Sequence, residues 1–394
     1  MLLMSGLVGA ILAGRVSADP GQGIHYGQWT FNPYVDVSAT YDSNVKQSGS
    51  GGNGDVFGDA TLGLRAGCSL YDFEFKGLGF LSARKYSDNT DSDFGAGGEF
   101  LRGKYGDRDQ VEIEVDQTFR RTTDIDRYGS EAAVGGVSPD SVLDVSARSR
   151  RDINQVGISA GKNVTDKLQL DAGYRFDDIN YDQAALADLR NHVGQIEAAY
   201  KVTDKSAGLL MAKAAIQENR SSDDSANYVA ARLGLKTEGT DKLVFKGSAG
   251  FQRYSPPDGD SETGFNFDLI ASWIATEKLG FEAGGRNGSQ MSSLYANNGT
   301  DYQIYWLGAT CRINPTITTT LSGAYRIDNY MNPVPSENGP VDRKDKGFAA
   351  RLRADYQAPA KFLQLYAEAA YEDSSSNVNG YDDVRIALGT ILVY

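Results

Sequence analysis

The chain has 394 residues, with 45 glycines and 22 tyrosines but only 10 prolines, a composition that favours turns and aromatic strands over helices. The formal net charge of −13 argues against nucleic acid as a partner. After the N-terminus, no apolar run approaches the roughly 18 residues of a membrane-spanning helix.

Residues 1–18, MLLMSGLVGAILAGRVSA, predict an export signal. The apolar run is too short to cross a bilayer, and Ser17 and Ala18 offer small residues for cleavage before Asp19. The usual positive leading segment is missing, because the first charge is Arg15. A buried N-terminal strand is the alternative interpretation.

From about residue 30 the chain repeats a unit of two strands joined by a long polar loop, and short turns separate the units. Four of these turns contain a threonine followed by an acidic residue and a lysine, at Thr165, Thr203, Thr240 and Thr276. Looser versions occur near Pro315 and Pro359. The repeat therefore predicts a series of hairpins.

The predicted strands alternate between apolar and polar residues. In residues 348–356, Phe348, Leu352 and Tyr356 share one face, and Arg351 and Arg353 share the other. Nearly every strand follows this pattern, and none is apolar on both faces, although a large soluble sandwich would bury some strands on both faces.

Long polar loops on one side, short turns on the other and an even number of strands are typical of outer-membrane barrels. We predict an all-β fold, a single transmembrane antiparallel up-and-down β-barrel of about 18 strands, with short periplasmic turns and long extracellular loops. The expected organisation is a signal peptide at 1–18, a periplasmic segment at 19–30 and the barrel at 31–394. The expected location is the bacterial outer membrane, in contact with lipid and lipopolysaccharide.

The terminal segment RIALGTILVY is predicted to be the closing strand, paired with the first strand near FNPYVDVSATY. Its apolar face would meet lipid, and Tyr394 would lie at the membrane interface, where tyrosine rings are favoured. The predicted lipid-interface aromatics are Tyr41, Tyr174, Tyr200, Phe245, Tyr356 and Tyr394.

The chain resembles the beta-barrel porin 2 family. The resemblance is carried by ATYDSNV at 39–45, the strand ends GYRFDD at 173–178 and GAYRID at 323–328, and the terminal VRIALGTILVY. It implies an outer-membrane barrel without catalytic residues. Some members are associated with exopolysaccharide operons, which implies a path for the polymer across the outer membrane.

The polar faces of the strands predict a lumen of mixed charge. Candidates for its wall are Arg65, Lys76, Glu112, Glu114, Arg175, Arg232, Lys246, Arg286, Trp306, Arg312, Arg326, Arg351, Arg353 and Arg385. Inward arginines could guide an acidic polymer, and Trp306 could stack on sugar rings. Alternatively, the arginines only balance the carboxylates, and Trp306 only packs against the wall.

The main functional prediction is a conduit for exopolysaccharide export, working with a periplasmic polysaccharide-export protein. The alternative is a general diffusion porin or sugar-uptake channel, in which the long loop at 121–151 constricts the lumen.

Other activities have little support in the sequence. Only two histidines occur, His25 and His192, so a histidine-based active site is disfavoured and no catalytic residue is predicted. No metal site or cofactor is predicted, although the acidic loops offer oxygen ligands such as Asp88 and Asp91. Cys68 and Cys311 are expected to stay unpaired.

Overall fold

The computed structural model describes residues 16–19, 21–47, 49, 52–123, 149–184, 186–220, 222, 224–240, 242–295, 298–336, 339–378 and 380–394. Within this part of the chain the fold is all-β apart from a single 3-10 turn at Thr90–Ser92. No helix in the described residues has the length and apolar character needed to span a bilayer.

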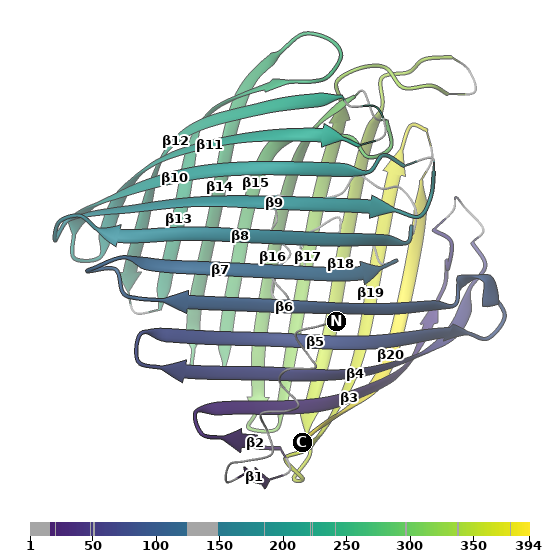
Figure 1. Cartoon of the computed structure of the whole chain (residues 1–394). Helices are drawn as coiled ribbons and strands as arrows, with labels where there is room; N and C mark the ends of the chain where they lie inside the picture. Colours follow the sequence, from purple (N-terminus) through teal and green to yellow (C-terminus); the bar gives the residue numbers. More distant parts are fainter. Residues whose placement is uncertain are drawn as a thin grey trace.

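One sheet of 20 strands forms the molecule, and neighbours in the sequence are neighbours in the sheet (Figure 1). The strands are β1 Val16–Asp19, β2 Gly23–Tyr26, β3 Trp29–Asp42, β4 Asp55–Leu70, β5 Phe73–Tyr86, β6 Phe94–Tyr105, β7 Glu112–Thr122, β8 Arg151–Asn163, β9 Leu168–Tyr181, β10 Leu189–Thr203, β11 Ser206–Asn219, β12 Ser225–Thr240, β13 Leu243–Ser255, β14 Glu262–Thr276, β15 Leu279–Met291, β16 Gly299–Asn314, β17 Ile317–Tyr330, β18 Lys344–Gln357, β19 Leu363–Ser376 and β20 Tyr381–Val393.

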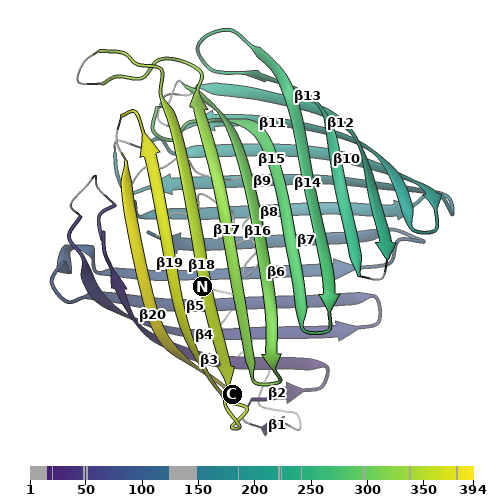
Figure 2. The same cartoon turned by 180° about the vertical axis from the view of Figure 1, so that it is seen from behind.

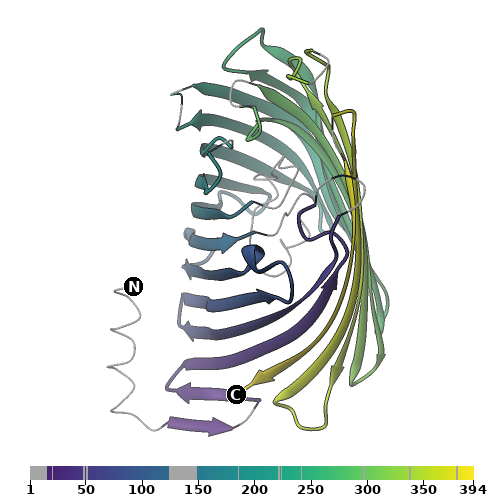
Figure 3. The same ribbon diagram turned by 90° about the vertical axis from the view of Figure 1, so that its right-hand side faces the viewer.

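The last strand closes the sheet on the first long strand. Residues 385–393 of β20 pair antiparallel with residues 34–42 of β3, so β3–β20 form a closed barrel of 18 strands (Figure 3). The strands β3–β12 cross the strands β13–β20 at a large angle when the barrel is seen from the front or from behind (Figures 1 and 2). Crossing of the two walls is expected, because closure requires strands to tilt against the barrel axis. The predicted fold class, strand number and closing pair are confirmed.

Two short strands extend the sheet beside the beginning of β3. Residues 24–26 of β2 pair with residues 29–31 of β3, just beyond the point where β20 ends, and β1 pairs with β2. The first barrel strand begins at Trp29, two residues before the predicted boundary at 31. The signal peptide and the periplasmic placement of 19–30 stay predictions.

The repeated threonines form the short turns. The hydroxyl of Thr165 accepts hydrogen bonds from the backbone N–H groups of Lys167 and Leu168, at 3.2 and 3.0 Å. Thr203, Thr240 and Thr276 each accept one from the N–H two residues later, at 3.2–3.3 Å. Such side chain to backbone bonds stabilise turns, which explains why the same residue type recurs there.

Candidate channel wall

Side-chain contacts between distant strands identify the inner face of the barrel. The ammonium of Lys246 on β13 lies 2.8 Å from the carboxylate of Glu197 on β10, although two strands separate them. The hydroxyl of Tyr366 on β19 likewise donates to Asp36 on β3, 3.1 Å away, across β20. Contacts of this kind require the concave side of a curved sheet, so the face that carries these residues is the inner one.

The outer face is apolar and exposed. Leu62, Leu81, Phe251 and Leu388 are each more than 60% exposed, as expected for side chains that meet lipid rather than water. Five of the predicted interface aromatics, Tyr41, Tyr174, Tyr200, Tyr356 and Tyr394, are 39–53% exposed, and Phe245 is partly buried. Their depth in the membrane stays a prediction.

Most of the predicted lumen cations form ion pairs on the inner face. Eight of the eleven lie within 4 Å of a carboxylate: Lys76–Glu74 2.7 Å, Arg175–Asp177 2.9 Å, Arg232–Asp268 3.9 Å, Lys246–Glu197 2.8 Å, Arg326–Asp328 2.6 Å, Arg351–Glu368 2.6 Å, Arg353–Asp355 2.9 Å and Arg385–Asp383 3.1 Å. The two predicted lumen carboxylates are also paired, Glu112 with Lys104 at 2.8 Å and Glu114 with Arg102 at 2.5 Å. The charges of the wall therefore largely neutralise one another.

Several of these pairs share a local pattern, an arginine and an aspartate two positions apart. Residues i and i+2 of a strand point to the same face, so Arg175 meets Asp177 and Arg326 meets Asp328 without help from another strand. Arg343 and Asp345 repeat the arrangement at the start of β18, at 2.8 Å.

The remaining three predicted cations, Arg65, Arg286 and Arg312, form no ion pair with a carboxylate in the part of the chain that the structure describes. The guanidinium of Arg65 lies over the ring of Tyr34, 4.9 Å from its centroid, and that of Arg286 lies 5.0 Å from the centroid of Trp306. Trp306 also donates from its indole N–H to Glu282 at 3.3 Å. Arg312 is exposed on the same face.

The connection between β15 and β16 folds against the inner side at the long-loop end. Its Ser292 and Ser293 are at most 1% exposed. The backbone N–H of Met291 donates to the side-chain oxygen of Gln217 on β11 at 2.7 Å, and Ser293 accepts from the N–H of Ala187 at 2.9 Å. These bonds join segments that are several strands apart, so the described part of this connection lies against the inner side of the wall at the long-loop end.

Tyr295 and Arg343 extend the same contact network toward the β17–β18 connection. The Arg343 guanidinium donates to the Tyr295 hydroxyl at 3.0 Å and lies over the ring of Tyr330, 5.0 Å from its centroid. Burial opposes the charge of Arg343, but the hydrogen bonds to Asp345 and Tyr295 outweigh it and raise the pKa of Arg343 above its ordinary value. Arg343 therefore stays charged in this loop.

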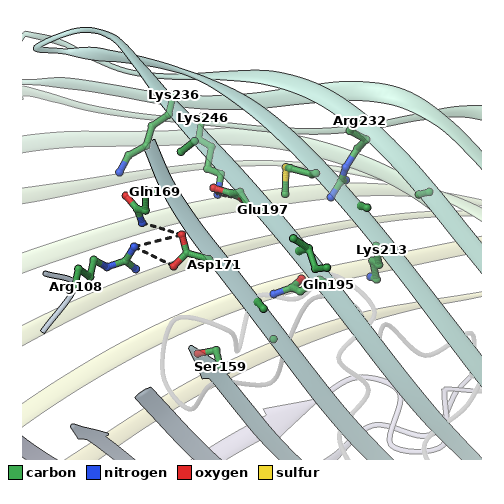
Figure 4. A pocket seen from close by; sticks show the side chains of 17 residues that line it. Arg108, Ser159, Gln169, Asp171, Gln195, Glu197, Lys213, Arg232, Lys236 and Lys246 are labelled. Carbon is green, nitrogen blue, oxygen red and sulfur yellow. Dashed lines mark hydrogen bonds and ion pairs between the residues drawn. The ribbon is translucent and has the colours of Figure 1, made fainter. Parts of the chain in front are cut away.

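A cavity of about 410 Å³ opens on the inner face over β8–β13 (Figure 4). Its polar and charged lining is Arg108, Ser159, Gln169, Asp171, Gln195, Glu197, Lys213, Arg232, Lys236 and Lys246. Arg108 and Asp171 form an ion pair of 2.9 Å at one end of it. The cavity occupies the short-turn half of the wall, since Arg108 lies in the β6–β7 turn and Lys236 lies near the end of β12.

Two alternatives weighed from the sequence concern other parts of the chain. The loop at 121–151 lies mostly outside the described residues, so its predicted role as a constriction stays a prediction. The side chain of His192 contacts the hydroxyl of Tyr174 at 2.7 Å. Asp188, which is close to His192 in the sequence, instead accepts a hydrogen bond from the N–H of Tyr181.

Among the described residues, no group of three or more His, Cys, Asp and Glu side chains could hold a metal ion. Cys68 and Cys311 are free cysteines, as expected.

Residues 19–392 match the family model described as "Putative beta-barrel porin 2". The chain belongs to this family. A closed 18-strand barrel with an apolar outer face and a charged inner face is the architecture of a porin channel in the bacterial outer membrane, and the family match covers almost all of it. This porin therefore contacts outer-membrane lipid.

The chain is also similar to several solved structures. OccK1 (OpdK) of Pseudomonas aeruginosa is 10% identical, with a TM-score of 0.49, and the match covers 92% of this chain and 99% of that one. OccAB4 of Acinetobacter baumannii is 12% identical, with a TM-score of 0.46 and coverage of 95% and 100%. The FrpB iron transporter of Neisseria meningitidis is 12% identical, with a TM-score of 0.47 and coverage of 87% and 62%. No curated protein sequence matched the chain.

Sequence reasoning missed two features of the wall. The inward β15–β16 connection has no distinctive composition, because SSLYANN reads as an ordinary polar loop. Lys236 was also missed, although the Thr240 turn sets the hairpin register and could have placed it opposite Lys246.

Proposed function

We propose that this porin is a passive channel for hydrophilic solutes without strong charge, with neutral saccharides as its main cargo. The observation that supports this proposal is the pairing of eight of the eleven predicted lumen cations with carboxylates. Strong selectivity between ions needs rings of uncompensated charge along a pore. A wall of ion pairs can form hydrogen bonds with sugar hydroxyls as water does, without the strong electric field of uncompensated charges.

The test uses the purified full-length protein in planar bilayers and in vesicles. In a KCl gradient we expect the permeability ratio of chloride to potassium to stay within about threefold of unity, because each paired charge contributes only a weak field. Vesicles that contain the protein should swell in isotonic glucose and maltose. Strong ion selectivity, or no swelling in either sugar, would contradict the proposal.

Export of an exopolysaccharide is the second candidate, and the inward aromatic rings favour it. Tyr34, Tyr366 and Trp306 lie on the inner face, where rings can contact the apolar faces of a sugar chain. This function would also need a periplasmic export partner. Both candidate functions use the same polar wall, and they differ in the length of the saccharide that passes through the channel.

Deletion of the gene separates the two candidates. Loss of surface and released polysaccharide, with an intact envelope, would support export if the full gene restores the polymer and a gene lacking residues 384–394 does not. Unchanged polymer would leave the diffusion channel as the function and would rule out export as the main role.

A further inference from the structure

A row of three residues across β8, β9 and β10 forms the floor of the cavity over β8–β13. Gly173 of β9 lies directly opposite Ser159 of β8 on one side and Gln195 of β10 on the other. A Cβ atom at Gly173 would lie no closer than 3.4 Å to any heavy atom outside its chain neighbours, and the nearest atoms would belong to the side chains of Gln195 and Ser159. The inner wall is therefore open above Gly173.

Other glycines on the inner face are covered by aromatic rings. A Cβ atom at Gly63 would collide with the ring of Tyr34, and one at Gly389 would collide with the ring of Tyr366. Gly173 has no such cover, and its φ is not in the left-handed region that requires a glycine. The glycine at this position therefore keeps space free in the wall.

The two residues beside Gly173 carry unused hydrogen-bonding groups. The side chains of Ser159 and Gln195 are exposed and project into the cavity (Figure 4). In the part of the chain that the structure describes, neither side chain forms a hydrogen bond with another residue. A hydroxyl and a carboxamide both donate and accept hydrogen bonds. A ligand in the cavity can therefore replace water at both groups.

The next row toward the short turns supplies fixed acceptors whose charge is balanced. Asp171 of β9 lies directly opposite Glu197 of β10. Arg108 pairs with Asp171 at 2.9 Å, and Lys246 pairs with Glu197 at 2.8 Å. Gln169 also donates to Asp171 at 2.8 Å. Each carboxylate has about four lone-pair sites, so both keep acceptor capacity for a ligand while the wall neutralises their charge.

These groups fit a neutral ligand with several hydroxyls. Sugar hydroxyls can donate to the carboxylates and can both donate to and accept from the serine and the amide. A charged ligand gains little from Arg108 and Lys246, because both are already engaged with carboxylates. The volume of about 410 Å³ lies toward the small end of small-molecule sites, which suits a single sugar unit.

We infer that Ser159, Asp171, Gly173, Gln195 and Glu197 form a binding subsite for one hexose unit of a neutral saccharide, on the short-turn half of the channel wall. We refer to these five residues as the saccharide recess. The inference rests on the proposed function, since it names the place where the channel holds a sugar during passage. The binding is expected to be weak, because a channel must also release what it binds.

The test measures ion current through single channels of the full-length protein in planar bilayers while glucose is added. A sugar in the recess obstructs ions, so the current should fall relative to the sugar-free current of the same variant. Gly173→Leu fills the recess and should raise the glucose concentration for half-maximal block by at least about tenfold, since it denies the sugar more than one hydrogen bond. Gln195→Leu should raise it by about fivefold, the size expected for one hydrogen bond.

Gly194→Leu is the matched control. Gly194 precedes Gln195 on β10, so its substituent points to the outer face, and no heavy atom lies within 4 Å of a Cβ atom there. This variant should leave the block by glucose unchanged. Glucuronate should block the wild-type channel no more strongly than glucose does.

Unchanged block in Gly173→Leu, equal loss in Gly194→Leu, or stronger block by glucuronate than by glucose would overturn the subsite. If Gly173→Leu does not fold, unchanged block in Gln195→Leu would overturn it instead. Sugar uptake in vesicles without any block of the wild-type current would overturn the subsite and leave the proposed channel standing. Block of the current without uptake of any sugar would support the subsite and refute the proposed channel, so the two failures are distinguishable.

Discussion

Asp328→Asn should strongly destabilise the barrel, because it removes the charge that balances a buried arginine. The side chains of Arg326 and Asp328 are only 1% and 6% exposed. The guanidinium makes hydrogen bonds of 2.6–2.9 Å to both carboxylate oxygens. Breaking a buried ion pair by changing one partner costs about 3–5 kcal/mol, because the remaining charge stays out of water.

Asp355→Asn provides the matched comparison. Arg353 and Asp355 have the same spacing and nearly the same separation, 2.9 Å, but their side chains are 25% and 22% exposed. Water and the carboxylate of Glu368, 3.4 Å from the guanidinium of Arg353, can still stabilise the arginine that is left behind, so we expect a loss of about 1 kcal/mol or less. Burial and the lack of water around the pair, rather than its spacing, should therefore account for the larger cost of Asp328→Asn.

The free energy of unfolding is measured by urea titration of the protein folded in lipid vesicles, with the fluorescence of its three tryptophans as the signal. Heat-modifiable mobility on gels checks that each variant has folded. Equal losses in the two variants, or a loss below about 1 kcal/mol for Asp328→Asn, would refute the claim that burial makes this pair costly to break.

Three further predictions concern the mouth, the outer face and the last residue. Gln217→Leu removes the acceptor for the N–H of Met291, so it should cost about 1 kcal/mol of stability and raise single-channel conductance; unchanged conductance would show that the β15–β16 connection does not narrow the pore. Leu388→Arg places a charge near the middle of β20 on the lipid side and should cost about 2–4 kcal/mol in urea titrations, with Leu388→Ala as the milder control; equal losses would contradict a lipid-facing position. Tyr394→Ala should reduce the amount of barrel recovered in outer-membrane fractions relative to Tyr356→Ala, and equal recovery would exclude a special role for the terminal ring.

The barrel could be predicted because its pattern is local. Alternation with period two assigns each residue to a face, and the Thr-containing turns fix where each hairpin reverses. Once those turns are placed, antiparallel pairing follows with little freedom, and closure pairs β20 with β3 because they are the last and the first long strands of the series. The same reasoning placed Trp306, Arg353 and Arg385 on one face of the sheet.

Which charged residues pair, and where the loops lie, depend on the curvature of the barrel wall. The alternation of apolar and polar residues in the sequence does not specify that curvature. Lys246 meets Glu197 because the wall between β10 and β13 is concave enough for side chains two strands apart to converge. Gln217 meets Met291 for the same reason, across β12–β14. Pairs such as Arg326 with Asp328 are different, since residues i and i+2 share a face and could be read directly from the sequence.

At the seam between β20 and β3, the charged residues of the inner wall also favour the correct register of barrel closure. Arg385 lies opposite the fully buried Asp42 at this seam, and the serine hydroxyl of Ser43 lies 3.4 Å from Asp383. A register slip by one residue would turn the inner set of β20 outward and bring its outer set, including Leu388, into the lumen. Because the slipped state would expose Arg385 to lipid and leave Asp42 without its cross-strand cation, the inner-face charges disfavour wrong closure as well as lining the channel.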